Sequence, residues 1–139
     1  MSDTPELKVS VVTPDGVVYK NNTSLVVCKT SNGEIGLMAN HTPLLATVAI
    51  GEVKIKLADG NYDEVAVGGG FLEFSNNNLS IIADVAERKE NIDISRAERA
   101  RNRAKERIEK ARNLHDDDEL RRAEISLKRA INRIKVSGH

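Results

Sequence analysis

The chain has 139 residues, with 21 Lys and Arg against 21 Asp and Glu, so its formal net charge is zero. This balance excludes a uniformly basic nucleic-acid-binding protein. The single cysteine, Cys28, excludes an internal disulfide and a structural zinc site built on several cysteines. No run approaches the roughly eighteen apolar residues of a membrane span. The polar start of the chain indicates no secretory signal, so we expect a location on the cytoplasmic side.

The zero net charge is the sum of two unlike parts. Residues 1–86 carry 5 Lys and Arg against 10 Asp and Glu, a net charge of −5, whereas residues 87–139 carry 16 against 11, a net charge of +5. Eight of the nine glycines and all three prolines also precede residue 87. The sequence therefore predicts a turn-rich domain over 1–86 and a helical domain over 87–139.

Short alternating runs, separated by turn residues, predict an all-β first domain. The pair Asp59-Gly60 lies between two such runs and indicates a hairpin. Turns arrive about every 8–12 residues, which favours an antiparallel β-sandwich or a flattened barrel. Cys28 falls in an apolar run and is expected to be a buried thiol. The expected strands cover residues 7–12, 17–20, 24–30, 33–38, 51–57, 62–67, 71–74 and 79–85.

The second domain has the apolar periodicity of two helices. The break at residues 113–118 is short, so the helices should form an antiparallel hairpin and give the whole chain an α+β fold. Asp116, followed by Glu119, predicts the N-cap of the second helix, and Asp93 or Ser95 the N-cap of the first. Because the shared stripe is narrow and rich in alanine, the hairpin should be marginally stable and able to detach or straighten. The stripe consists of Ala97, Ala100, Ala104, Ile108, Ala111 and Leu114 on the first helix and Leu120, Ala123, Leu127, Ala130, Ile131 and Ile134 on the second.

Four arginines should gather near the open end of this hairpin. If residue i lies opposite residue 229 − i, Arg96 faces Arg133, Arg129 lies one turn away, and Arg103 extends the same face of the first helix. Like charges at short range favour an anion between them. A phosphate suits the guanidinium fork and the N–H groups of a helix start, but nearby carboxylates or simple solvation of helical arginines would also account for the pattern.

Two further features, a glycine run and a histidine, lack the signatures of an enzyme active site. Gly68-Gly69-Gly70 is not followed by the Lys-Ser/Thr of a phosphate-binding loop, and it indicates a bulge or a close backbone approach. His41 has no nucleophile signature and no second histidine near it. We therefore expect a hydrogen-bonded structural histidine, with catalysis by His41 left as an alternative. No pair of histidines has the spacing of metal ligands, so no metal site is predicted.

Three blocks of sequence resemble the epsilon subunit of bacterial rotary F-type ATP synthases. They are the opening strand with Pro14-Asp15-Gly16, the Gly-x-x-Gly-x-x-x-x-His-x-Pro-Leu-Leu block that begins at Gly33, and the Gly-Gly-Phe strand over residues 67–74 with the strand that follows it over residues 78–84. The resemblance extends over nearly the whole chain. One departure is that many members have Pro where Met38 or Ala39 stands, which affects a turn.

The resemblance implies an accessory subunit of the central stalk with no active site of its own. The β domain would lie against the gamma subunit and the c-ring and would support the coupling of proton flow to ATP synthesis. The helical hairpin would extend towards the beta subunits and restrain ATP hydrolysis. The protein would be peripheral to the cell membrane, without insertion into it. A free-standing nucleotide sensor is the alternative, and co-purification with gamma would distinguish the two.

The resemblance also implies a regulatory ATP site. Some members of the family bind ATP through an Ile/Leu-Asp-x-x-Arg-Ala motif, which is present here as Ile92, Asp93, Arg96 and Ala97. ATP would favour the compact hairpin and relieve inhibition, and it would be a regulatory ligand and not a required cofactor. The family's further ligands correspond to Glu87, Arg103, Arg129 and Arg133.

Overall fold

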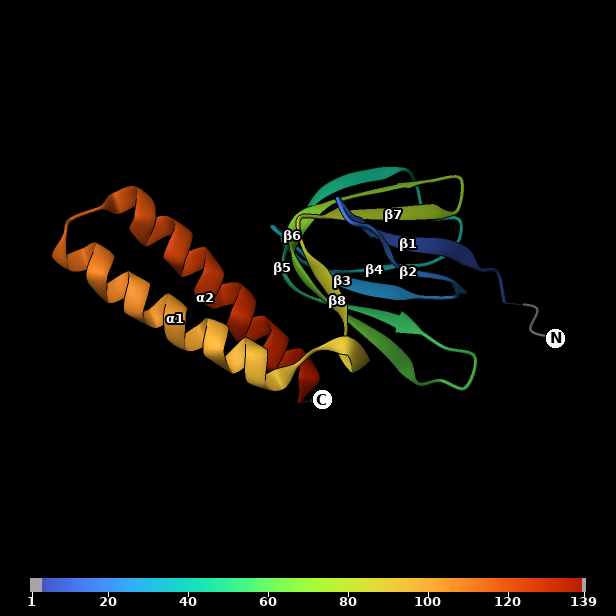
Figure 1. The fold of residues 1–139 in the computed structure, drawn as a ribbon. Coiled ribbons are helices and arrows are strands. Elements are labelled where there is room, and N and C mark those ends of the chain that lie inside the picture. The colour runs from blue at the N-terminus through green and yellow to red at the C-terminus, as the bar shows by residue number, and fades with distance from the viewer. Residues whose placement is uncertain (1–3, 139) are drawn as a thin grey trace. The chain divides into compact units, whose positions relative to one another are not determined.

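The computed structural model describes residues 4–138, which fold into two units with a division between Lys89 and Glu90. The first unit is all-β and the second is a pair of helices (Figure 1). The composition of the sequence predicts this division at 86/87, but Glu87 lies in the last strand of the first unit. In chain order the described elements are β1 (Leu7–Thr13), β2 (Gly16–Thr23), β3 (Val26–Thr30), β4 (Gly33–Leu37), β5 (Leu44–Lys56), β6 (Tyr62–Ser75), β7 (Asn78–Ala83), β8 (Ala86–Arg88), a 3₁₀ turn η1 (Lys89–Asn91), α1 (Ile94–Asn113) and α2 (Asp117–Ser137).

Two long strands, β5 and β6, join the two layers of the sandwich. The strand order is β2-β1-β7-β6-β5-β3-β4, and β8 pairs with β6 outside this path. The second half of β6 pairs with β7, whereas its first half pairs with β8. The long strands therefore take part in both layers, and the sandwich predicted from the sequence is confirmed.

The three consecutive glycines lie where β6 changes partner. Gly68 donates its N–H to Val85, and Gly69 accepts the N–H of Asp84, so the ladder continues between β7 and β8. Gly70 has a φ of +154°, and a Cβ on it would collide with the carbonyl oxygen of Ile82. This is the close backbone approach that the glycine run indicates.

The core of the sandwich is aliphatic and draws on both layers. Alternate residues of β1, such as Val9 and Val11, are buried together with Ile55 from the other layer and with Phe74, one of the largest fully buried side chains. Cys28 belongs to this cluster, and burial raises the pKa of its thiol to about 11. The thiol is therefore a packing group and not a nucleophile at neutral pH.

Three details differ from the expected strands. β1 and β7 run parallel, with Val9 opposite Leu79, so the sheet is mixed and not purely antiparallel. β5 begins at Leu44, seven residues before the expected start at Gly51, because these residues pair with the second half of β6. Residues 62–67 and 71–74, expected as two strands, are one continuous strand because the glycines bend β6 without ending it.

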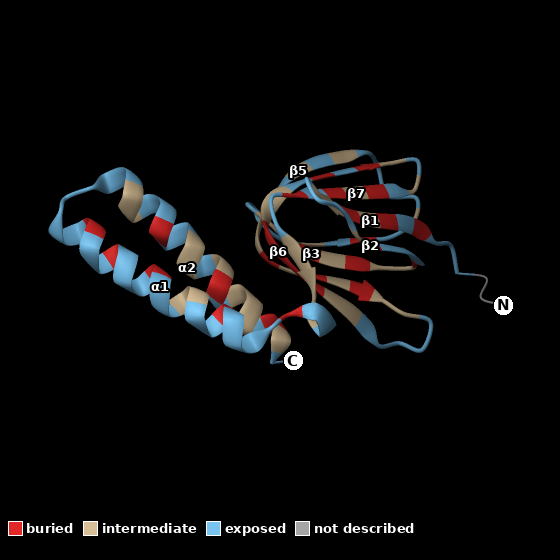
Figure 2. Ribbon diagram, in the orientation of Figure 1, coloured by how far each residue is buried: buried red, intermediate tan, exposed pale blue. Residues whose placement is uncertain are grey.

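The two helices form the expected hairpin with the expected caps. The Asp93 carboxylate accepts the N–H of Arg96 at 3.1 Å, and the Asp116 carboxylate accepts the N–H of Glu119 at 3.1 Å. Buried positions of the helices are separated by exposed stretches (Figure 2) and are mostly alanine. Leu114, expected in the stripe, is instead the exposed C-cap of α1. None of the described helices is both long and apolar enough to cross a lipid bilayer.

Candidate functional site

The predicted ATP-binding motif spans the N-cap and the first turn of α1, with Ile92 just before them. Asp93 is the N-cap, so its carboxylate is already engaged with the Arg96 N–H. Ile92 and Ala97 are buried, whereas the Arg96 side chain is exposed. The motif therefore presents one guanidinium beside a helix start, where free N–H groups and the helix dipole favour an anion.

The other predicted arginines lie along both helices. Arg103 is exposed on α1, and neither it nor Arg96 forms an ion pair among residues 4–138. Arg129 and Arg133 are half-buried on α2. The last predicted ligand, Glu87, is half-buried on β8 opposite Ala66 and belongs to the first unit. ATP binding by this set stays a prediction.

The register of the hairpin can be read from one cross-helix contact. Arg107 of α1 contacts Glu119 and Ser126 of α2. The expected register places Arg107 opposite position 122 (229 − 107), and its two partners lie on either side of that position. The contact is compatible with the expected register, in which Arg96 lies at the level of Arg133.

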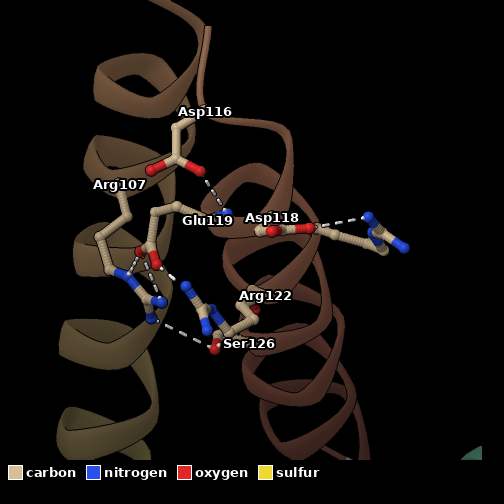
Figure 3. Close-up of polar contacts among 7 residues, drawn as sticks. Arg107, Asp116, Asp118, Glu119, Arg122 and Ser126 are labelled. Atoms are coloured by element: carbon tan, nitrogen blue, oxygen red, sulfur yellow. Dashed lines mark hydrogen bonds and ion pairs between the residues drawn. The ribbon is translucent and has the colours of Figure 1, made fainter. Parts of the chain in front are cut away.

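This cross-helix contact is a polar cluster at the closed end of the hairpin (Figure 3). The Nε and Nη2 atoms of Arg107 both lie 2.8 Å from Oε1 of Glu119, and Nη1 lies 3.4 Å from Oγ of Ser126. Arg122 reaches the other carboxylate oxygen at 3.5 Å. The sequence pattern does not predict this cluster: Asp116 followed by Glu119 predicts a capping box, whereas the Glu119 side chain contacts Arg107 and Arg122. The contact could have been predicted from the positions of residues 107 and 119, which are nearly equidistant from the turn that joins the two helices.

The sandwich carries an exposed row of apolar side chains, also missed from the sequence. Cross-strand pairs connect Val17 to Val12, Val12 to Ile82, and Ile82 to Phe71 across β2, β1, β7 and β6. Leu45 of β5 is diagonal to Phe71, which lies opposite Thr47. Val17 is 62%, Leu45 71% and Phe71 45% exposed. We call Val12, Val17, Leu45, Phe71 and Ile82 the outer apolar row.

The sequence pattern that could have predicted the outer apolar row is a set of adjacent apolar pairs within the strands. A half-buried strand alternates apolar and polar residues, so two adjacent apolar residues place one side chain outside. In β1 and β7 the inner members, Val11 and Ile81, are fully buried. Val12 is half-buried and the other four residues are exposed, and apolar surface of this kind is common at protein–protein interfaces. The adjacent pairs are Val11-Val12, Val17-Val18, Leu44-Leu45, Phe71-Leu72 and Ile81-Ile82.

His41 has the contacts of a residue that shapes a loop. Its Nδ1 lies 2.6 Å from the Thr42 carbonyl oxygen, and its ring meets the edge of Phe74 at 5.9 Å between centroids. Asn40 and Asn77 tie the same loop to the β6–β7 turn. Among residues 4–138 no cluster of three His, Cys, Asp or Glu side chains is arranged to hold a metal ion.

The two units correspond to the two domains of one protein class. Residues 6–89 match the family described as "ATP synthase, Delta/Epsilon chain, beta-sandwich domain", and residues 90–138 match "ATP synthase, Delta/Epsilon chain, long alpha-helix domain". The chain belongs to the ATP synthase delta/epsilon chain family, which confirms the resemblance inferred from the three sequence blocks.

Named relatives agree over the full length. The ATP synthase epsilon chain of Ligilactobacillus salivarius is 60% identical and covers 100% of both chains, and that of Levilactobacillus brevis is 51% identical over 96% of this chain and 95% of its own. A chain in the cryo-EM structure of the Euglena gracilis mitochondrial ATP synthase, OSCP/F1/c-ring, has a TM-score of 0.78 at 19% identity. That likeness covers 99% of this chain and 85% of the other, and it shows a shared fold.

Proposed function

We propose that this chain is the epsilon subunit of an F-type ATP synthase, an accessory part of the central stalk with no active site of its own. The observation that carries the proposal is the full-length identity to named epsilon chains, which includes both domains. In this role the subunit supports the rotational coupling of proton flow to ATP synthesis. It is peripheral to the cell membrane on the cytoplasmic side and reaches the membrane through the c-ring.

The outer apolar row supports docking of the sandwich on the gamma subunit. It runs across five strands of a rigid sheet, so a partner meets a preformed surface at little entropic cost. Phe71 lies between Ile82 and Thr47, away from the edges of the sheet. A large aromatic residue at the centre of an interface contributes most to affinity.

A substitution in the outer apolar row tests the assignment. Phe71→Ser should weaken binding to purified gamma subunit about tenfold or more, because it removes the central apolar anchor. Tyr62→Ser is the matched control, since Tyr62 is similarly exposed, at 42%, but lies outside the row. The measurement is a pull-down or titration with gamma. Full binding by the Phe71 variant counts against docking through this face. No binding by the unmodified chain favours a free-standing sensor.

The hairpin supports a second, regulatory role, in which ATP binds the compact state. The start of α1 offers helix N–H groups beside Arg96. In the register expected from the sequence, Arg133 lies at the same level. Arg103 and Arg129 extend this positive region on the two helices, and Ile92, Asp93 and Ala97 complete the part of the proposed set that lies in the second unit. Glu87, in the first unit, stays a prediction from the family resemblance. A triphosphate among guanidiniums would relieve their mutual repulsion, so ATP should bind the compact hairpin more tightly than the extended one.

An ATP titration tests this regulatory site. Arg96→Ala and Arg129→Ala should each weaken ATP binding by about tenfold or more, because each removes a charge-assisted hydrogen-bond donor. Arg121→Ala is the control, since Arg121 pairs with Asp118 on α2 and lies outside the proposed site. Equal affinity of the two variants and the control, or no ATP binding by the unmodified chain, would remove the site from the proposal and leave the stalk role standing.

A further inference from the structure

The polar cluster at the closed end of the hairpin is fixed from three sides. Within α2 and the turn, the Glu119 N–H is held by Asp116, and Arg122 lies 3.5 Å from one carboxylate oxygen. From α1, Arg107 approaches the other oxygen with two guanidinium nitrogens, each at 2.8 Å (Figure 3). The two oxygens of the Glu119 carboxylate are thus contacted by different arginines, one on its own helix and one on the facing helix.

Arg107 spans two turns of the facing helix. Its guanidinium contacts Glu119 and Ser126, which are seven residues apart and therefore on the same face of α2. The Ser126 hydroxyl in turn donates to the Arg122 carbonyl, which orients its oxygen towards Arg107. A one-turn slide of α1 along α2 would move Arg107 towards one of these residues and away from the other, so both contacts together are possible in one register only.

The apolar contact between the helices holds them weakly. The buried alanines recur at seven-residue spacing, as Ala97, Ala104 and Ala111 on α1 and Ala123 and Ala130 on α2. Each methyl group buries little area. A repeat of identical small residues also packs equally well in neighbouring registers. In pairs of helices, polar residues specify which register forms.

We propose that Arg107 and Glu119 form a clasp that holds the hairpin in its compact state and that must open before α1 and α2 can separate. The regulatory meaning of the clasp rests on the proposed function, because the hairpin must extend to restrain hydrolysis. The existence of the clasp does not depend on that function.

The clasp is suited to an equilibrium and not to permanent closure. The side chains of Arg107 and Glu119 are 44% and 32% exposed, so water and salt screen the pair. Pairs of this exposure shift a conformational equilibrium by only about two- to fivefold. The clasp therefore biases the hairpin towards the compact state while leaving it able to open.

Hydrogen exchange of backbone amides in the full-length chain tests the clasp without ATP or partner subunits. Arg107→Gln should accelerate exchange about two- to fivefold in α2, and Glu119→Gln should do the same in α1. Exchange is measured in the helix that does not carry the substitution, because a purely local effect would change exchange only in the substituted helix. The double variant should exchange no faster than the single variants, because both remove the same pair.

Arg121→Gln is the matched control. It removes an arginine and an ion pair from α2, but Arg121 pairs with Asp118 of its own helix, at side-chain exposures of 72% and 82%. Exchange in α1 should match the unmodified chain in this variant. If Glu119→Gln leaves α1 exchange at the Arg121→Gln level, or if the two clasp substitutions are additive, the clasp does not exist. ATP titration of the same proteins reports separately on the proposed function.

Discussion

Tyr19 shows how one residue connects three strands of the sandwich. Its hydroxyl donates to Oδ2 of Asp63 on β6 at 2.6 Å and accepts from Nδ2 of Asn21 at 3.0 Å. The guanidinium of Arg88, on β8, lies 5.2 Å from the ring centroid. Tyr19 is 3% exposed, and burial, followed by the Asp63 hydrogen bond, raises its pKa from 10.0 to about 12.

Tyr19→Phe should lower the free energy of unfolding by about 1 kcal/mol, because it removes a partly buried hydrogen bond and leaves Asp63 with one donor fewer. The folded-state pKa is raised, so the Tyr19 contribution is complete below about pH 10 and is lost as the pH rises through about 12. Urea unfolding of both proteins across this range is the measurement. The difference between them should shrink between pH 10 and 12, and a constant difference would contradict the titration of Tyr19.

At the scale of single elements, the helix caps carry a clear expectation. Asp116→Ala should destabilise the hairpin by about 1 kcal/mol, because the N–H of Glu119 loses its acceptor at the start of α2. Asp116→Asn keeps a side-chain oxygen there and should cost little. Helical circular dichroism during urea unfolding measures both variants. Equal loss in the two would mean that charge at the helix start matters and the hydrogen bond does not.

Structural features that depend only on neighbouring residues, such as helix caps and tight turns, could be predicted from the sequence. The cap residues Asp93 and Asp116 act within three residues of themselves, and the Asp59-Gly60 turn joins adjacent strands, so a short window contains the whole cause. The Arg107–Glu119 contact joins two elements, and many pairs of charged residues on the two helices are equally compatible with the sequence pattern. Its geometry appears only when the register of the hairpin is known.

At the scale of the whole molecule, the two units should unfold separately. The sandwich has a continuous aliphatic core, whereas the hairpin buries mainly alanine. In urea, the helical signal at 222 nm should therefore fall before the tyrosine fluorescence changes. The two probes report on different units, because the chain has no Trp and both tyrosines, Tyr19 and Tyr62, lie in the sandwich. Coincident transitions would show one cooperative unit.

The parallel pairing of β1 with β7 could not be predicted from the sequence. Where consecutive strands pair, as β1 with β2 and β5 with β6, a short turn between them indicates the antiparallel pairing. β1 and β7 are separated by more than sixty residues and pair in parallel, and no turn signal records that choice. The predicted ATP site has the same difficulty, since its residues are spread over β8, α1 and α2.

The position of β1 between β2 and β7 sets an order of events during synthesis. The first strand leaves the ribosome early, yet one of its two neighbours ends only at Ala83. A sheet that depends on this distant pairing cannot close on its N-terminal portion alone, and distant pairings are slow to form. One edge of β1 therefore stays unpaired in the nascent chain until residue 83 has emerged from the ribosome. An arrest of translation before that point leaves an aggregation-prone chain.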